Sequence, residues 1–478
     1  ERDRLHQEIQ RTQGALTSRY DYDPMGRLKH QTATANRTLQ HNGKLNTLVG
    51  GVVRRSYRYD QAGNLIQTAD QRSGVLDYVY DKLGRIESAV NKQTGSREKF
   101  AFDPAHNILS DKVSDGLKDK GLSEHLSDRH HISRTQGRNI GKGNRLQEYN
   151  GIEYTYDALG NMIYRQLPNG ESQLFQYDTE NQLVLAEIKK NSGESQTWEY
   201  AYDPFGRRLS KERTDKGALT ATAPKQTHFV WDGSRLLQEY NYRGSYSYIY
   251  TDQDSYEPLA QVFDNHKDQQ QYLFYFHNNQ IGTPHEMTDI HGNLLWYGSY
   301  SAWGSLSSEN KIYPNIHQPF RLQNQYCDAE TGLHYNFFRY YDPGCGRFVT
   351  QDPIGLEAGS NLYIFAVNVQ AWVDPLGLDE LYALVARKDG WYPVMQWGQK
   401  KAVGEIYLKE GELWKIGTSK NASKRYSQRY LDSIGPGVDM KIIHSDISLK
   451  LTRLLERMRI RGYEVWKGFL PPGNKCRH

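Results

Sequence analysis

The sequence has no long apolar run, few cysteines and no apolar leader. No stretch of 18 or more apolar residues occurs among its 478 residues, so no membrane-spanning helix is expected. The opening residues, ERDRLHQEIQRTQG, lack the apolar centre of a signal peptide. Its three cysteines, Cys327, Cys345 and Cys476, have neither disulfide-framework nor metal-ligand spacing. These features argue against a helical membrane protein, a disulfide-stabilised domain and a cysteine-based zinc site.

Apolar residues are scarce, but aromatic residues are abundant. Hydrophobic residues make up 37% of the chain and charged residues 24%, and the mean hydropathy is −0.81. The chain nevertheless contains 35 tyrosines and 9 tryptophans, side chains that favour half-buried positions on pleated sheets. A chain of this length is expected to form about two to four domains. The composition therefore predicts a mainly β protein whose sheets each keep one wetted face.

One phrase recurs along the first three quarters of the chain: aromatic-x-Tyr-Asp, a turn containing Gly or Asn, then an apolar residue. The copies begin at Tyr20, Tyr57, Tyr78, Phe100, Tyr154, Phe175, Tyr200 and Phe229. Alternating aromatics form a strand with one buried face, and Asp followed by Gly or Asn forms a tight turn. Each copy is therefore predicted to be a hairpin that buries its apolar face only by stacking on its neighbours. The repeated Tyr and Asp residues are expected to be scaffold.

These phrases resemble the YD repeats of Rhs (rearrangement hotspot) proteins. The segment RLQNQYCDAETGLHYNFFRYYDPGCGRFVTQDPIGL resembles the Rhs core terminus that precedes a variable toxin. The resemblance implies a YD-repeat β-hairpin spiral that forms a hollow shell around a C-terminal toxin. The expected domains are the YD-repeat shell at residues 1–320, the core terminus with autoprotease motifs at 321–378, and the toxin domain at 379–478. Because the chain begins within the pattern and without Met, it is interpreted as a fragment of a longer protein.

The phrase D-P-x-G-L occurs twice, at Asp352–Leu356 and at Asp374–Leu378. Two close carboxylates cannot both ionise, and a pair that shares a proton can activate water against a peptide bond. Alternatively, each aspartate only forms its own turn. In Rhs proteins and the related Tc-toxin C-components, this arrangement is an intramolecular aspartyl protease. The resemblance implies that the catalytic pair is Asp352 and Asp374, that Arg347 supports it, and that the bond cut joins Leu378 to Asp379.

The charge of the chain is unevenly distributed. Residues 379–478 contain 19 Lys and Arg against 11 Asp and Glu, a net charge of +8, whereas the rest of the chain has a net charge of −4. A basic segment on a mildly acidic body favours a polyanionic partner, such as nucleic acid.

The last 100 residues contain no YD phrase and alternate between strand and helix patterns. A small α/β domain with helices and a three-stranded antiparallel sheet is therefore expected. Strands are predicted at 401–409 and 412–417, around a turn at Gly411, and at 438–444; helices are predicted at 423–431 and 448–462.

Within this segment, GEIYLKEGELWKIGTSKNASKRYSQRY resembles the opening of a GIY-YIG (URI-type) nuclease. The resemblance implies that Tyr407 belongs to the first motif half and Lys415–Gly417 to the second, with Lys415 in place of the family's second tyrosine. Arg425, eight residues after Gly417, corresponds to the catalytic arginine. Glu456 corresponds to the metal-binding glutamate, and Asn474 to the terminal asparagine that helps to shape the site.

The chemistry of phosphodiester cleavage requires these residue types. Arg425 can stabilise the negative charge of the transition state, Glu456 can hold Mg²⁺ or Mn²⁺, and Tyr407 can take a proton from the attacking water. The residues predicted to bind nucleic acid are Lys415, Lys420, Lys424, Arg429 and Asn474. The alternatives are that Tyr407 is a strand aromatic packed in the core, and that Arg425 and Glu456 are solvated helix charges.

The sequence thus predicts an Rhs antibacterial toxin that releases a metal-dependent nuclease by autoproteolysis, with DNA favoured over RNA as substrate. The resemblance implies synthesis in the bacterial cytoplasm, delivery into target cells by type VI secretion proteins through a missing N-terminal region, and a cognate immunity protein. Two alternatives stay open. One is a cargo that modifies or only binds nucleic acid, and the other is a YD-repeat surface or adhesion protein without enzymatic activity.

Overall fold

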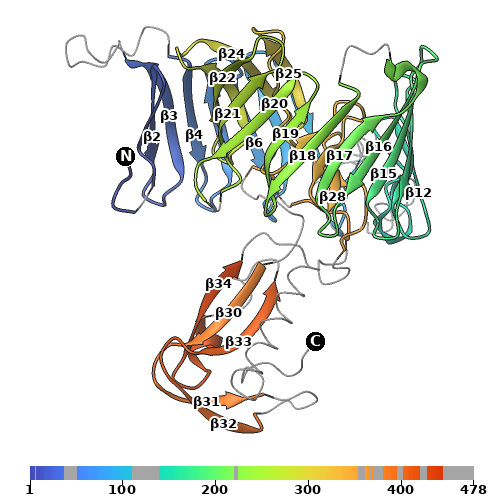
Figure 1. The fold of residues 1–478 in the computed structure, drawn as a ribbon. Coiled ribbons are helices and arrows are strands. Elements are labelled where there is room, and N and C mark those ends of the chain that lie inside the picture. Colours follow the sequence, from blue (N-terminus) through green and yellow to red (C-terminus); the bar gives the residue numbers. More distant parts are fainter. Residues whose placement is uncertain are drawn as a thin grey trace, which may run out of the picture. The chain divides into compact units, whose positions relative to one another are not determined.

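The computed structural model describes residues 1–5, 7–36, 51–109, 139–219, 224–253, 255–353, 361–366, 368–370, 380–395, 402–419 and 428–444 (Figure 1). The chain divides into two compact units. The first unit contains Glu1–Gln351 and Ser360–Pro375, and the second contains Asp352–Gly359 and Leu376–His478. Among the described residues, no helix is long and apolar enough to cross a membrane. Cys327 and Cys345 are free thiols.

The first unit begins with an eight-stranded antiparallel sheet in which every strand pairs with its neighbours in sequence (Figure 1, blue). Its strands are β1 (Gln10–Gln13), β2 (Leu16–Tyr22), β3 (Leu28–Ala35), β4 (Val53–Tyr59), β5 (Leu65–Asp70), β6 (Gly74–Tyr80), β7 (Ile86–Asn91) and β8 (Arg97–Lys99). A short separate hairpin follows, formed by β9 (Ala101–Phe102) and β10 (Ile108–Leu109).

A fifteen-stranded antiparallel sheet follows, again in sequence order. Its strands are β11 (Glu148–Tyr149), β12 (Ile152–Tyr156), β13 (Met162–Gln166), β14 (Ser172–Tyr177), β15 (Leu183–Lys189), β16 (Ser195–Tyr202), β17 (Arg208–Arg213), β18 (Gln226–Asp232), β19 (Arg235–Asn241), β20 (Gly244–Tyr250), β21 (Pro258–Asn265), β22 (Gln270–Asn278), β23 (Pro284–Asp289), β24 (Leu294–Tyr300) and β25 (Leu306–Lys311). Two 3₁₀ turns, η1 (Lys142–Asn144) and η2 (Lys216–Leu219), lie outside the strands. Both large sheets confirm the predicted succession of stacked hairpins.

The core terminus forms a third, four-stranded antiparallel sheet. Its strands are β26 (Tyr326–Cys327), β27 (His334–Asn336), β28 (Arg339–Asp342) and β29 (Arg347–Phe348). The aromatic side chains of these strands join the same buried core as the aromatic side chains of the repeats.

The aspartate of each YD phrase closes the turn that follows it. Asp60 accepts hydrogen bonds from the backbone N–H of Asn64 (2.8 Å) and from its side-chain Nδ2 (2.9 Å). Asp81 binds Arg85 in the same way, through its N–H (3.0 Å) and Nε (2.6 Å). Gly63 lies between the first pair with φ +93°, a conformation that glycine adopts without steric cost. The phrase therefore encodes a turn whose ends are fixed by one carboxylate.

The tyrosine before each turn aspartate joins successive hairpins. Its hydroxyl donates to the carbonyl of the apolar residue that follows the preceding turn, as Tyr80 does to Leu65 (2.7 Å) and Tyr177 does to Met162 (2.8 Å). The strand register shifts at the same tyrosines, and such a β-bulge redirects a side chain. Where tyrosine occupies this position it therefore links successive hairpins, whereas Phe102, before Asp103, has no hydroxyl to make this bond.

Buried charges hold the core terminus against the fifteen-stranded sheet. Arg208 on β17 is fully buried and donates through Nη1 to Asp328 Oδ2 (2.5 Å). Lys211, on the same strand, donates to Asp328 Oδ1 (3.0 Å) and to Glu330 Oε2 (2.9 Å). The guanidinium of Arg208 also lies 4.4 Å from the ring centroid of Tyr335. Because a buried ion is costly unless it is paired, these contacts fix one position of the core terminus.

A second ion pair supports the same docking. Arg165 on β13 donates to Asp342 Oδ2 (2.7 Å) and to Gln173 Oε1 (2.9 Å), and all three side chains are buried. Asp342 ends β28 and pairs in register with Arg347 on β29. The four-stranded sheet is therefore anchored to the fifteen-stranded sheet through Asp342, the direct strand partner of Arg347.

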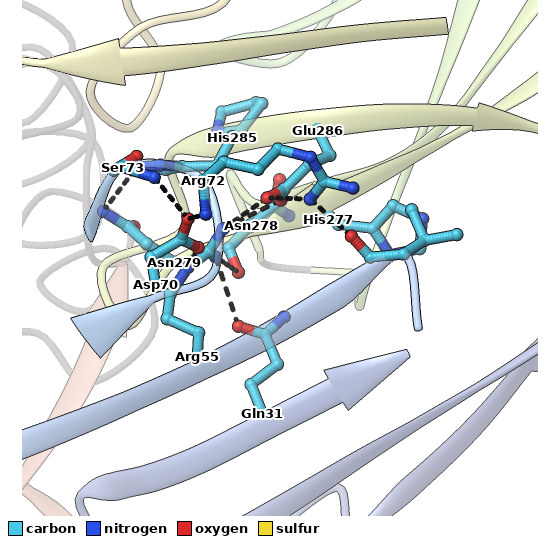
Figure 2. A network of polar contacts seen from close by, with 12 residues as sticks. Gln31, Arg55, Asp70, Arg72, Ser73, His277, Asn278, Asn279, His285 and Glu286 are labelled. Atoms are coloured by element: carbon cyan, nitrogen blue, oxygen red, sulfur yellow. Dashed lines mark hydrogen bonds and ion pairs between the residues drawn. The ribbon is translucent and has the colours of Figure 1, made fainter. Parts of the chain in front are cut away.

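Arg55 joins the two large sheets (Figure 2). From β4, its Nη2 lies 2.8 Å from both carboxylate oxygens of Glu286 on β23, and its Nε donates to Asp70 (2.9 Å). Its Nη1 donates to Gln31 Oε1 and to the carbonyl of Asn278, both at 3.4 Å. The side chain of Arg55 is only 2% exposed. This bidentate pair fixes how β4 and β5 lie against β22 and β23.

The second unit contains a three-stranded antiparallel sheet in the order β33-β30-β34, a two-stranded sheet and one short described helix. Its elements are β30 (Glu380–Ala386), β31 (Gly390–Val394), β32 (Gly404–Leu408), β33 (Leu413–Ser419), α5 (Gln428–Asp432) and β34 (Val438–His444). The predicted small α/β domain with three antiparallel strands is confirmed, and β34 has the predicted bounds. The predicted helix at 448–462 lies outside the described residues.

The strand pairing differs from the sequence prediction. The predicted strands at 401–409 and 412–417 correspond to β32 and β33, but they do not pair with each other across Gly411. Instead β32 pairs with β31, and β33 pairs with β30, a strand that the prediction lacked. The four strands form one bent ribbon, in which the N–H of Gly411 donates to the carbonyl of Ala386 (2.8 Å). Gly411, with φ +82°, lies at the bend of the ribbon rather than at its tip.

Replacing Asp328 with Ala is expected to lower the free energy of unfolding by about 3–5 kcal/mol, because it leaves Arg208 and Lys211 buried near fewer counter-charges. Urea unfolding followed by intrinsic fluorescence measures the change. Glu194→Ala removes an exposed carboxylate that pairs with Lys190 and Arg213, and it should shift the urea midpoint much less. Equal shifts for both variants would contradict the anchoring role of Asp328.

Acid should weaken the first unit through Glu239 on β19. Burial raises the pKa of Glu239, but His317 and the hydroxyls of Tyr248 and Tyr326 outweigh burial and lower the pKa from 4.5 to about 2. Because the folded pKa lies below the unfolded one, the stabilisation is present above pH 4.5 and is lost as the pH falls to 2. Urea unfolding across this range should show a decline that Glu239→Gln reduces. An unchanged decline in the variant would rule out Glu239 as its source.

Candidate functional site

Arg347, the predicted supporting residue of autoproteolysis, is buried on β29. Its Nη1 donates to Asn107 Oδ1 (3.2 Å), and its Nη2 donates to the carbonyl of Asn144. The guanidinium also lies 4.8 Å from the ring centroid of Tyr363. Within the described part of the chain, Nε of Arg347 has no hydrogen-bond partner. The partners named here are all neutral.

Asp352, the first predicted catalytic aspartate, is 5% exposed. The second predicted aspartate, Asp374, and the predicted cut between Leu378 and Asp379 lie outside the described residues.

The chain between the two D-P-x-G-L phrases returns to β29. The N–H of Phe348 donates to the carbonyl of Tyr363 (2.9 Å), and Arg347 forms an antiparallel bridge with Ile364. Tyr363 is fully buried, and its hydroxyl donates to the carbonyl of Gly160 (2.8 Å). The segment at 361–370 is thus fixed both to β29 and to the repeat turn at Gly160.

The second candidate site surrounds β33 in the second unit. Lys415 pairs in register with Leu384 on β30, and Gly417 pairs with Tyr382. On its other side, β30 pairs with β34, where Tyr382 lies opposite Ile442. The predicted second motif half therefore lies at the edge of the three-stranded sheet, beside the central strand.

Tyr407 lies on β32, in a different sheet from Lys415. It pairs in register with Trp391, and the two ring centroids are 5.7 Å apart. Its side chain is 50% exposed, so Tyr407 is not packed in the core. The structure thus separates two residues that the sequence analysis assigned to one motif.

The residue that strand pairing does bring beside the second motif half is Tyr382, which the sequence analysis did not single out. Its strand, ELYALVA, starts two residues after the second D-P-x-G-L phrase. The sequence signal was the nearly continuous apolar run after Glu380, which is typical of a central strand. The sequence analysis missed Tyr382 because the similar strand GEIYL also has a tyrosine close to the Lys-Ile-Gly motif half.

The helix that carries Arg429 is anchored to β34. Arg387 donates through Nη1 to Asp432 (2.7 Å), which ends α5, and through Nε to Asp439 (2.6 Å) on β34. Behind this contact, the hydroxyl of the fully buried Tyr392 donates to the carbonyl of Gly437 (2.9 Å). These bonds fix the end of the helix relative to the sheet.

The other predicted nuclease residues lie outside the described part of the chain: Lys420, Lys424, Arg425, Glu456 and Asn474. Among the described residues, no group of three or more His, Cys, Asp or Glu could hold a metal ion. Asp432 and Asp439 are already paired with Arg387. The described residues therefore do not form a site for Mg²⁺ or Mn²⁺, and such a site would depend on Glu456.

A long array of YD hairpins joined to a small α/β unit is the architecture expected of an Rhs protein, and residues 273–310 match the RHS protein family. Together with the repeats, this match identifies an Rhs region in the chain. Its C-terminal segment matches a second family, described as URI fold toxin 2, over residues 395–468. The recognition of an Rhs region followed by a URI-type toxin domain is thus confirmed.

Several curated relatives are similar over about four fifths of the chain. Double-stranded DNA deaminase toxin A of Burkholderia cenocepacia is 38% identical over 400 residues, which are 80% of this chain and 26% of that protein. Toxin protein Tse5 of Pseudomonas aeruginosa is 29% identical, covering 79% and 30% respectively. The probable deoxyribonuclease RhsA of Dickeya dadantii is 29% identical, covering 81% and 25%. The chain therefore spans between a quarter and a third of the length of these relatives.

The solved structure of the Photorhabdus luminescens Tc holotoxin pore is similar in fold. It matches with a TM-score of 0.56 and 17% sequence identity, and the match covers 79% of this chain and 19% of that one. This similarity confirms the predicted mainly β, YD-repeat fold.

Proposed function

We propose that this chain is the C-terminal region of an antibacterial Rhs toxin that cuts itself after Leu378 and thereby frees a metal-dependent nuclease. The observation that carries the proposal is the pairing of β33 with β30, which puts the Lys-Ile-Gly motif half beside a tyrosine-bearing strand in a basic segment. Two relatives from Dickeya dadantii are named probable deoxyribonucleases, which supports a nuclease and favours DNA over RNA.

The self-cleavage that we propose is general acid–base hydrolysis by Asp352 and Asp374. The ionised carboxylate takes a proton from water, and the resulting hydroxide attacks the carbonyl carbon of Leu378. The protonated carboxylate gives its proton to the carbonyl oxygen, which forms a tetrahedral diol. The other carboxyl, which now holds the proton taken from water, passes it to the nitrogen of Asp379 as the C–N bond breaks, and one diol hydroxyl returns its proton to the pair as the new carboxyl group of Leu378 forms. Arg347 favours the ionised form of one carboxylate. Burial of Arg347 and Asp352 supports this role, because their charges act more strongly away from water.

In the nuclease, we propose that Tyr382 takes the place assigned to Tyr407 and handles the proton of the attacking water. Register supports this choice, since Tyr382 lies opposite Gly417, whereas Tyr407 lies in another sheet and is half exposed. Arg425 would stabilise the transition state, with Lys415, Lys420, Lys424, Arg429 and Asn474 binding nucleic acid. A Mg²⁺ or Mn²⁺ ion held by Glu456 would polarise the phosphate when bound.

A cargo that modifies nucleic acid is the second candidate function. The relative from Burkholderia cenocepacia is named a DNA deaminase toxin and is the more similar of the relatives described above. The named activities of the relatives differ, although each matches about four fifths of this chain. The URI fold toxin 2 match lies in the C-terminal segment itself, and it therefore favours the nuclease. Delivery by type VI secretion, protection by an immunity protein and enclosure of the cargo by the shell remain part of the proposal.

The nuclease proposal predicts metal-dependent cutting of plasmid DNA by the full chain, which EDTA and Glu456→Ala should both abolish. Tyr382→Phe should slow cutting by about a hundredfold or more, as expected for loss of a general base, while Tyr407→Phe should change it little. Agarose gels of plasmid and of total RNA over time measure both. A larger effect at Tyr407 would overturn the choice of tyrosine, and no cutting of either substrate would overturn the nuclease.

The self-cleavage proposal predicts that the full chain yields a C-terminal fragment that begins at Asp379, whereas Asp352→Asn stays intact. An amide cannot take up or hold the shared proton of the pair, so hydrolysis should stop. Gel electrophoresis and intact mass measurement identify the fragment. Asp232→Asn, at an exposed turn aspartate that pairs with Arg235, is the matched control and should cleave normally. Cleavage of Asp352→Asn at the wild-type rate would exclude the aspartyl mechanism.

A further inference from the structure

Asn107 closes a YD turn and at the same time contacts the predicted protease residues. Its N–H donates to Asp103 Oδ1 (2.9 Å), and its Nδ2 donates to Asp103 Oδ2 (2.8 Å). This is the contact that Asn64 makes with Asp60 in an earlier repeat. The turn does not use the carboxamide oxygen of Asn107, which is directed at residues outside the repeat.

The oxygen of Asn107 accepts two further hydrogen bonds. One comes from Nη1 of Arg347 (3.2 Å), and the other comes from Nδ2 of Asn361 (2.9 Å). Nδ2 of Asn361 also donates to the carbonyl of Ala105 (2.9 Å), in the same turn. A carboxamide oxygen has two lone pairs, so both acceptor positions of Asn107 are in use. Asn107 is 2% exposed, so water does not compete for these bonds.

The same arrangement occurs at the other end of the returning segment. Oδ1 of Asn64 accepts a hydrogen bond from Nδ2 of Asn368 (3.4 Å), and Asn368 is buried. Two turn asparagines from the repeats therefore hold two asparagines of the segment at 361–370. That segment lies between the two D-P-x-G-L phrases. Each of its two asparagines is held by a turn of the repeats.

Three other repeats cannot make this contact. Arg27, Arg85 and Arg207 occupy the same position, four residues after the turn aspartate, and each donates Nε to that aspartate. Their remaining N–H groups reach the carbonyl of a neighbouring turn, as Arg85 does with Asp103 (3.1 Å). A guanidinium has no acceptor, so it cannot receive a hydrogen bond from Asn or from Arg347. At 64 and 107, asparagine supplies the acceptor oxygen that arginine lacks.

We propose that Asn107 and Asn64 are positioning residues for self-cleavage. Asn107 orients the guanidinium of Arg347 and fixes Asn361, and Asn64 fixes Asn368, so that the repeats hold two points of the chain between the two aspartates in place. This inference rests on the proposed self-cleavage. Misplacement of reacting groups by about 1 Å can cost on the order of a hundredfold in rate, which sets the scale of the expected effect.

The test follows self-cleavage of the full chain after cell-free synthesis, with the fragment quantified on gels over time. Asn107→Ala should slow cleavage by about tenfold to a hundredfold, and Asn64→Ala should slow it less, because it leaves Arg347 in place. The matched control is Asn293→Ala. Asn293 occupies the same turn position, four residues after Asp289, and donates to that aspartate through its N–H (2.8 Å) and its Nδ2 (2.8 Å). It should cleave within about twofold of the wild type.

The pH dependence of cleavage separates positioning from a general loss of structure. If Asn107 orients Arg347, the acid limb of the rate profile should move to higher pH in Asn107→Ala, because a displaced guanidinium favours the ionised carboxylate less. Asn293→Ala should leave the profile in place. Asn361→Ala is a second variant that removes the donor from the segment and leaves the repeat intact. It should slow cleavage as well, and this keeps the test valid even if Asn107→Ala fails to fold.

The outcomes are distinguishable. If Asp352→Asn is inert but Asn107→Ala and Asn361→Ala cleave at the wild-type rate, the positioning role is wrong and the self-cleavage stands. Equal slowing by Asn107→Ala and Asn293→Ala, with no shift of the profile, would also overturn it. If the wild type does not cleave, or if Asp352→Asn cleaves normally, the self-cleavage proposal fails and the positioning role fails with it.

Discussion

The contact between a turn aspartate and the residue four positions later is the constraint on which the first unit depends. It fixes both ends of each turn with one carboxylate, as in Asp60 with Asn64. Because the turn is fixed, the tyrosine before it reaches the carbonyl of the preceding hairpin, and the strands follow one another in sequence order across eight and then fifteen strands. The same contact determines which side-chain atoms are left over at each turn, and at Asn107 the atom left over is an oxygen that faces Arg347.

The buried charges have a different purpose from the turns. Arg208, Lys211 and Arg165 each pair with an acidic residue of the core terminus. Pairs of this kind contribute little net stability compared with apolar packing, but they tolerate one geometry only. They therefore specify where the four-stranded sheet sits on the repeats. Arg347 inherits its position from them, since its strand partner Asp342 is one of the paired acids.

Sequence patterns predicted the repeats well and the second unit only in part. The YD phrase combines period-two aromatics with a turn signal, so both strand and turn are encoded locally, and the stacking of hairpins follows. The partners of Arg208 and the role of Asn107 involve residues more than a hundred positions apart, which a single sequence does not connect. In the second unit, Tyr407 and Tyr382 lie in strands of similar composition. Only the strand pairing distinguishes the two tyrosines, and this pairing depends on the bend of the ribbon at Gly411.

The central place of β30 in its sheet has a consequence for the proposed cut after Leu378. This strand begins at Glu380, two residues beyond Leu378, and it is the shared neighbour of β33 and β34. A fragment that starts a few residues later would lack the middle of its sheet, and the two outer strands would have no common partner for their backbone N–H and C=O groups. A fragment trimmed in this way is therefore a different, unfolded molecule and not a shorter version of the same domain.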